Sequence, residues 1–294
     1  MSTQITLNRK VKSVVKIQIK SGNYTIQEDV TVDTFGIPIF NETNPDGLLW
    51  TSEHWNNGNP RTVDKYDPDD PTGLSVRTGS ANLFNIDGQG MLRMGGRQPR
   101  IYFKKDPIFY KNTEITGYFR RIGTDGANNG GFSIGCRSHP QGHSTNNANN
   151  IRTTTYYARL RNDGKVDFAK ELTHPKSSSA KSYRYFDGKL PSNKWFGAKF
   201  IVYTNKDEHA KLEFWLDKTS NGDLDKIGNK DNWELINEYL DDGDWEADIR
   251  DDYDGKVDPE TIISEGHGVC LIRNTEIDEA NYKYVSIREI IPPN

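Results

Sequence analysis

The sequence predicts an all-β protein, a sandwich or a barrel, from its composition and from the spacing of its apolar runs. Hydrophobic residues make up only 33% of the 294 residues, whereas aromatic residues reach 11% and glycine occurs 26 times. A chain poor in aliphatic residues but rich in aromatic and turn-forming ones suits strands joined by polar loops. Short alternating runs recur between turn signals from residue 81 onward, and no long run has a helical period.

Residues 1–33 are expected to form a basic arm built as a β-hairpin. Val and Ile alternate with Lys and Gln over 11–19, a turn follows at 21–23, and 24–32 reads as a second strand. Lysine and arginine are frequent here, and no acidic residue precedes Glu28. Two interpretations are open. The arm docks onto a partner, including another copy of the chain in self-assembly, or its lysines protect an edge strand against aggregation.

Residues 34–294 are expected to form one domain, because no repeat or linker divides them. Residues 41–80 are rich in Asn, Pro, Asp and Gly and predict long loops. The expected strands beyond them are 91–94, 100–104, 114–122, 131–139, 154–161, 165–172, 195–203, 210–217, 233–240, 268–274 and 282–290.

The segment 153–175 predicts a bulged hairpin whose turn is formed by residues 162–164, with Gly164 in the left-handed region. This register pairs Arg161 with Lys165, Leu160 with Val166, Arg159 with Asp167, Ala158 with Phe168, Tyr157 with Ala169, Tyr156 with Lys170 and Thr155 with Glu171. The face near the turn is apolar, and the opposite face carries an Arg159–Asp167 ion pair. Tyr156 and Lys170 continue the apolar face, as expected where a sheet leaves the core and lines a cleft.

The neighbouring segment 130–143 predicts a strand followed by a polar loop. Alternation places Phe132, Ile134 and Cys136 on one side, and Ser133, Gly135, Arg137 and His139 on the other. Small residues followed by Arg and His suggest a groove floor with a charged end. The loop that contains His143 is of the kind that borders substrate sites.

Charge and hydropathy exclude some classes of partner. The net charge of −4 argues against a general nucleic-acid binder, and no apolar run is long enough to span a membrane. The first residues lack a signal-peptide pattern, so a cytoplasmic protein, a mature secreted protein and a particle component all remain open. Cys136 and Cys270 form either one disulfide or two buried thiols.

The segments "DGKVDFAKELTHP", "NKWFGAKFIVY" and "AKLEFWLD" resemble jelly-roll proteins of the concanavalin-like superfamily. Within it, the polysaccharide-lyase branch of the alginate- and glucuronan-lyase type, together with uncharacterised relatives, is the most similar. The resemblance covers about residues 115–291. It implies a two-sheet antiparallel β-sandwich, the jelly roll, with a concave sheet that grips an acidic polysaccharide.

The resemblance also implies roles for individual residues in β-elimination. Removing the proton beside a uronate carboxylate requires that the carboxylate charge be neutralised, and a guanidinium binds both of its oxygens. Arg137 would neutralise the carboxylate, His139 would act as base and Tyr156 as acid, with Lys170 lowering the pKa of the tyrosine. The expected substrate contacts are Tyr157, Glu171, His174 and His143.

Each of these residues also has a structural interpretation. Tyr156 and Tyr157 suit strand positions with their hydroxyls at a rim, His139 and His143 suit a surface loop, and Lys170 and Glu171 suit an ion pair. The aromatic residues Trp50 and Trp55 would be exposed if they stack sugars.

No cofactor is expected, with calcium as the one alternative. The loop 217–225 has oxygen-bearing side chains at alternate positions, as in a calcium loop, although a plain acidic turn has the same pattern. The candidate ligands are Asp217, Thr219, Asn221, Asp223 and Asp225.

Two functions follow from the sequence. The first is a polysaccharide lyase that acts on a uronate-containing glycan. The second is a non-catalytic glycan-binding or structural assembly protein of the same fold, which the basic arm favours.

Overall fold

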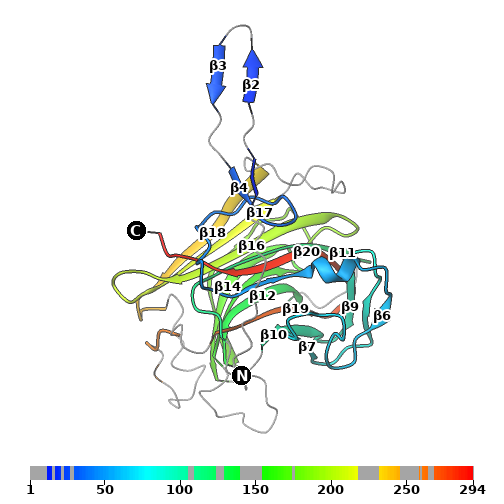
Figure 1. The fold of residues 1–294 in the computed structure, drawn as a ribbon. Coiled ribbons are helices and arrows are strands. Elements are labelled where there is room, and N and C mark those ends of the chain that lie inside the picture. Colours follow the sequence, from blue (N-terminus) through cyan, green and yellow to red (C-terminus); the bar gives the residue numbers. More distant parts are fainter. Residues whose placement is uncertain are drawn as a thin grey trace, which may run out of the picture.

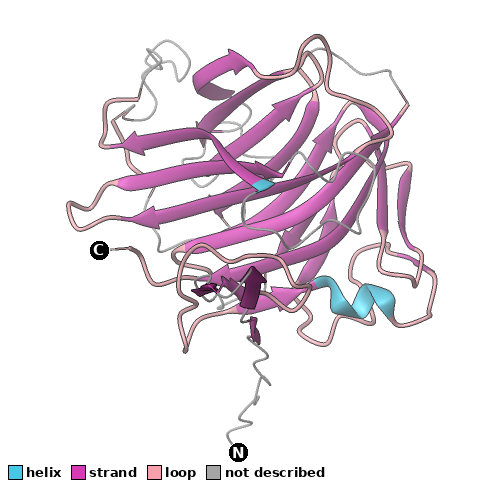
Figure 2. Cartoon of the chain, turned by 90° about the horizontal axis from the view of Figure 1, so that it is seen from above, coloured by secondary structure: helices cyan, strands magenta, loops and turns pink. Residues whose placement is uncertain are grey.

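The computed structural model describes most of the chain. The described residues are 12–14, 17–20, 23–26, 30–104, 109–123, 129–139, 154–173, 176–217, 232–245, 258, 260–263 and 268–293. No helix among them is both long and apolar enough to cross a membrane. Among the described residues, strands account for nearly all of the regular structure, and the short 3-10 helix η1 (Ser52–Asn56) lies beside them (Figure 2).

Two antiparallel sheets pack face to face, which confirms the predicted two-sheet β-sandwich (Figure 1). The seven-stranded sheet has the order β15-β14-β13-β12-β19-β10-β7. Its strands are β7 (Ser75–Thr78), β10 (Arg100–Phe103), β12 (Gly131–Ser138), β13 (Thr155–Arg161), β14 (Lys165–Thr173), β15 (Lys176–Arg184) and β19 (Val269–Thr275).

The nine-stranded sheet has the order β18-β17-β16-β11-β20-β9-β8-β6, with β5 paired to β20. Its strands are β5 (Leu49–Thr51), β6 (Arg61–Thr62), β8 (Leu83–Ile86), β9 (Leu92–Gly96), β11 (Thr113–Ile122), β16 (Trp195–Thr204), β17 (Ala210–Asp217), β18 (Trp233–Asp241) and β20 (Ile277–Glu289). Neighbours along the chain often lie apart in the sheets, so most pairings are non-local.

The hydrophobic core fills the space between the two sheets. Phe132 of β12 stacks on Phe119 of β11 with ring centroids 4.1 Å apart, and both rings are buried. Each such ring contributes roughly 1.5–3 kcal/mol on burial. The prediction of exposed tryptophans is wrong, because Trp50 and Trp55 are 1% and 0% exposed and belong to this core.

The described residues of the N-terminal arm form two antiparallel strand pairs. β1 (Lys12–Val14) pairs with β4 (Val30–Val32), and β2 (Ile17–Lys20) pairs with β3 (Asn23–Ile26). The β2–β3 end projects away from the sandwich in Figure 1. The division into an arm at 1–33 and a domain at 34–294 stays a prediction.

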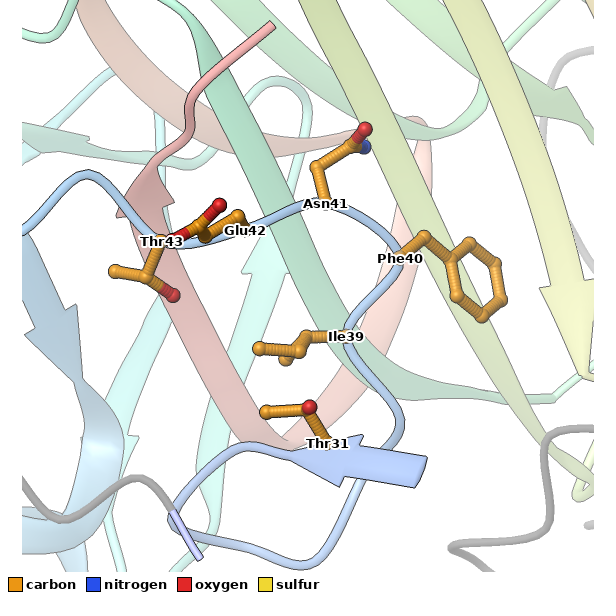
Figure 3. A pocket seen from close by; sticks show the side chains of 6 residues that line it. All are labelled: Thr31, Ile39, Phe40, Asn41, Glu42 and Thr43. Carbon is orange, nitrogen blue, oxygen red and sulfur yellow. The ribbon is translucent and has the colours of Figure 1, made fainter. Parts of the chain in front are cut away.

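The segment 33–43, here called the strap, joins the arm to the nine-stranded sheet. Glu114 of β11 accepts a hydrogen bond from the Phe40 backbone, and Arg288 of β20 donates to the Asn41 carbonyl at 3.0 Å. A surface pocket beside the strap is lined by Thr31, Ile39, Phe40, Asn41, Glu42 and Thr43. In Figure 3 the Phe40 and Asn41 side chains point in different directions, so these groups do not converge on one ligand position.

The hairpin of β13 and β14 has the predicted register. Six of the seven predicted pairs are present, from Leu160–Val166 to Thr155–Glu171, and the register does not include the predicted Arg161–Lys165 pair next to the turn. Gly164 has a φ of 83°, and its backbone N–H donates to the Arg161 carbonyl at 2.9 Å. The Arg159–Asp167 ion pair is also present, with Nε and Oδ1 2.5 Å apart.

Strand β12 departs from the predicted alternation at Arg137. This residue has a φ of 52°, in the left-handed region, and the pairing of β12 with β19 shifts between Gly135 and Ser138. A bulge of this kind re-aims the side chain. Arg137 therefore points between the sheets, where it bonds to Thr204 of β16 at 2.8 Å, and its predicted place beside Ser133 and Gly135 is wrong.

Cys136 and Cys270 lie on neighbouring strands as free, buried thiols.

Candidate functional site

Three of the four predicted catalytic residues meet inside the sandwich. Arg137, Tyr156 and Lys170 gather with Asp241 of β18 in what we call the inner cluster. The Tyr156 hydroxyl donates to Asp241 Oδ2, and Lys170 Nζ lies 2.8 Å from the same oxygen. Arg137 donates to the Ile263 carbonyl at 2.8 Å, and the Ile263 N–H donates to the Tyr156 hydroxyl at 3.0 Å.

The inner cluster is shielded from solvent. The exposed fractions are 1% for Arg137 and 0% for Tyr156, Lys170 and Asp241. Burial, together with the Asp241 charge, raises the pKa of Tyr156 well above its usual value. The predicted lowering of this pKa is wrong. The tyrosine stays protonated and acts as a hydrogen-bond donor.

The outer face of the seven-stranded sheet, which points away from the core, carries a second polar group. Its register places Thr78, Arg100, Arg273, Ser133, Arg159 and Asp167 side by side across six strands, and we call this the arginine row. Two residues along the strands from this row, on the same face, lie Tyr102 of β10 and Tyr157 of β13.

One arginine of this row, Arg273, packs on a tyrosine ring. The Arg273 guanidinium lies 4.6 Å from the centroid of the Tyr157 ring, a cation–π arrangement. The Tyr157 hydroxyl donates to Glu171 Oε2 at 3.3 Å. Burial raises the pKa of Tyr157 and of Tyr102, against a lowering influence of the nearby arginines. Tyr157 and Glu171, two predicted substrate contacts, thus lie on the same face.

The arginines of this row differ in their partners. Arg159 pairs with Asp167, whose carboxylate also lies 3.4 Å from Arg161. Arg100 and Arg273 have no ion pair with a carboxylate within the described part of the chain. Three of their buried nitrogens, Nε and Nη1 of Arg100 and Nε of Arg273, form no hydrogen bond there. Each unsatisfied buried donor costs about 1–3 kcal/mol, so these arginines suit an anionic ligand.

Arg100 and Arg273 were not predicted as site residues. The alternation in "RIYFK" places Arg100 on the same face as Tyr102, and the alternation in "VCLIRN" places Arg273 on the same face as Leu271. The pairing that brings the two arginines together joins strands that are far apart in the sequence. The alternation in each strand therefore indicates an arginine on this face, but the sequence does not show that the two arginines are neighbours.

The predicted histidines are placed only in part. His139 follows the end of β12, is partly exposed, and its backbone N–H donates to the Thr154 carbonyl at 3.0 Å. His143 and His174 lie outside the described residues.

The predicted calcium loop is likewise described at one position only. Asp217 is buried, and its carboxylate accepts a hydrogen bond from the Tyr118 hydroxyl at 2.6 Å. Thr219, Asn221, Asp223 and Asp225 lie outside the described residues. Within the described ranges, no group of three or more His, Cys, Asp or Glu side chains is placed to hold a metal ion.

Comparison with known proteins found similarity in structure only. No family model and no curated protein matches the chain. The potassium-bound Emp46p carbohydrate recognition domain has a TM-score of 0.46 at 11% identity, covering 83% of this chain and 98% of that one. The VIP36 exoplasmic/lumenal domain, bound to Ca²⁺ and Man3GlcNAc, has a TM-score of 0.41 at 11% identity, covering 76% and 86%.

A metal-free form of lectin I-B4 from Griffonia simplicifolia has a TM-score of 0.40 at 9% identity, covering 82% of this chain and 98% of that one. By their names, two of these are a carbohydrate recognition domain and a lectin, and the third is a domain with a bound Man3GlcNAc. The resemblance to polysaccharide lyases gains no support from them. At such identities and TM-scores the similarity carries no inference about what this chain binds.

Proposed function

We propose that this chain is a non-catalytic protein that binds an acidic glycan on the outer face of its seven-stranded sheet. The observation that carries the proposal is the pair Arg100 and Arg273, side by side on β10 and β19. Arg100 Nη2 donates to Gln98 at 3.2 Å, but three other buried nitrogens of the pair have no hydrogen-bond partner among the described residues. A carboxylate or sulfate group would accept those hydrogen bonds, and guanidinium groups bind such anions through two parallel bonds.

Two different observations support the two parts of the proposed ligand, its anionic group and its glycan chain. The arginine pair supports the anionic group, whereas the glycan rests on the resemblance of about residues 115–291 to concanavalin-like jelly rolls. The Tyr157 ring fixes the plane of Arg273 and so prepares it for binding. Self-assembly through the N-terminal arm remains a prediction.

We do not assign β-elimination to Arg137, Tyr156 and Lys170. A uronate would have to reach side chains that are at most 1% exposed, and it would have to displace Asp241 from Tyr156 and Lys170. Breaking a buried charge pair in this way costs about 3–5 kcal/mol before any chemistry begins.

The proposal is tested by calorimetric titration of the full chain with alginate, glucuronan and pectate, and with neutral mannan as a comparison. We expect binding of one or more acidic polymers that weakens with added salt, and no binding of mannan. The variant Arg100→Met/Arg273→Met is expected to bind at least about tenfold more weakly, because charge-assisted hydrogen bonds are lost.

Arg97→Met is the matched control. Arg97 is 79% exposed, lies near Arg100 in the sequence and has only a long contact of 3.7 Å to Glu276. It removes a positive charge without touching the arginine row, so its binding should stay close to that of the wild type. Equal binding of mannan, unchanged binding by the double variant, or release of an unsaturated uronate product would each contradict the proposal.

A further inference from the structure

Lys170 and Asp241 form a buried ion pair that joins the two sheets. Lys170 belongs to β14 of the seven-stranded sheet, and Asp241 ends β18 of the nine-stranded sheet. Nζ and Oδ2 are 2.8 Å apart, and neither side chain has exposed surface. The Trp245 ring centroid lies 5.3 Å from Nζ, so an aromatic ring packs against one side of the pair.

The surroundings disfavour the charged ammonium form of Lys170. Burial lowers the pKa of Lys170, against the opposing influence of Asp241. In a medium of low dielectric constant, transfer of one proton from the ammonium to the carboxylate removes two buried charges at once. The result is an amine with a free electron pair, held next to a neutral carboxyl group.

The geometry is also suitable for reaction. With Nζ 2.8 Å from Oδ2, the nitrogen is within about 3–4 Å of the carboxyl carbon, close to the separation of a near-attack arrangement. The Tyr156 hydroxyl donates to the same Oδ2 and so polarises the carboxyl group. Because its pKa is raised by burial and by Asp241, this hydroxyl remains a proton donor.

We propose that Lys170 and Asp241 become joined by an isopeptide bond. After the proton transfer, the electron pair of Nζ forms a bond to Cγ of Asp241. The C–O bond to Oδ2 then breaks, and this oxygen leaves as water with the carboxyl proton and one amine proton. Tyr156 donates a proton to the departing oxygen and regains one from nitrogen, so no oxidant or other reactant is needed. The product is a neutral secondary amide and one molecule of water.

A second buried pair in the same fold provides the contrast. Lys199 Nζ and Glu114 Oε1 are 2.6 Å apart with no exposed surface, on the outer face of the nine-stranded sheet. Here the ammonium also donates to the Pro38 carbonyl and to Thr116 Oγ1. Although burial raises the pKa of Glu114, Lys199 and Arg288 lower it to about 2. A second cation, Arg288, thus forms a direct ion pair with this carboxylate and keeps it ionised, whereas Arg137 of the inner cluster donates to the Ile263 carbonyl. An ionised carboxylate resists attack by an amine.

The proposal is tested by the intact mass of the purified, folded chain, measured after denaturation. We expect a mass lower than that of the sequence by one water molecule, and a proteolytic peptide in which Lys170 and Asp241 are cross-linked. Lys170→Arg and Asp241→Ala should each restore the full mass. Tyr156→Phe should reduce the cross-linked fraction, because the proton donor is gone.

Lys199→Arg is the matched control and should leave the water loss unchanged. The full sequence mass in the folded wild-type chain would overturn the proposal, as would a water loss that maps to a different residue, such as a succinimide. If Lys170→Arg does not fold, the wild-type chain alone tests the proposal, because fragmentation of its cross-linked peptide identifies the two joined residues directly.

Discussion

The two faces of the seven-stranded sheet differ in how their buried charges are paired. On the inner face, Lys170 and Tyr156 converge on the carboxylate of Asp241. On the outer face, Arg100 and Arg273 lie together with buried nitrogens that have no partner in the described chain. The consecutive residues Tyr156 and Tyr157 mark the division, since one faces each side. Matched charges hold the fold together, whereas unmatched ones cost stability and are retained where a ligand compensates for them.

The largest expected effect is the loss of Asp241. Asp241→Ala removes the partner that Lys170 and Tyr156 share, together with the covalent link proposed between Lys170 and Asp241, and we expect a loss of about 3–5 kcal/mol in the free energy of unfolding. Urea unfolding monitored by tryptophan fluorescence measures it. A loss below about 1 kcal/mol would show that the inner cluster does not stabilise the fold.

The acid side of the stability profile is expected to depend on Glu114. Its pKa is lowered from 4.5 in the unfolded chain to about 2 in the fold, so the ionised form stabilises the folded state. This contribution is complete above pH 4.5 and is lost as the pH falls toward 2. Its full size is about 3 kcal/mol.

Urea unfolding between pH 7 and pH 3 measures this dependence. The same series on Glu114→Gln should be flatter with pH, even though this variant is less stable overall. An equally steep loss in the variant would assign the acid sensitivity to other carboxylates.

The smallest expected change in the free energy of unfolding comes from replacing the two arginines on the outer face. Arg100→Met/Arg273→Met should unfold within about 1 kcal/mol of the wild type, or be more stable, because it removes buried donors without partners. Thermal unfolding of the double variant, with Asp241→Ala beside it, checks the contrast. A strongly destabilised double variant would place these arginines with the structural charges.

Local chemistry made part of this architecture predictable. The β13–β14 register follows from Gly164 and its turn, so every pair from Leu160–Val166 to Thr155–Glu171 could be derived from one short segment. The Arg159–Asp167 ion pair follows from the same register. The all-β sandwich follows similarly from the spacing of turns and alternating runs.

Non-local pairing made the rest unpredictable. The left-handed conformation of Arg137 has no signal in "IGCRS", and it moves the side chain from the predicted groove into the interior. Asp241 reaches Lys170 only because β18 and β14 belong to facing sheets. The neighbourhood of Arg100 and Arg273 depends on which distant strands pair, and alternation within a strand does not determine it.

The strap also determines how mechanical load would pass through the molecule. It links the projecting hairpin to Glu114, Lys199 and Arg288, all on the nine-stranded sheet. A pull on the hairpin would therefore be carried along β11, β16 and β20, while the strands bearing Arg100 and Arg273 lie off this route. Tension on the arm would then leave ligand binding at the arginine row unchanged.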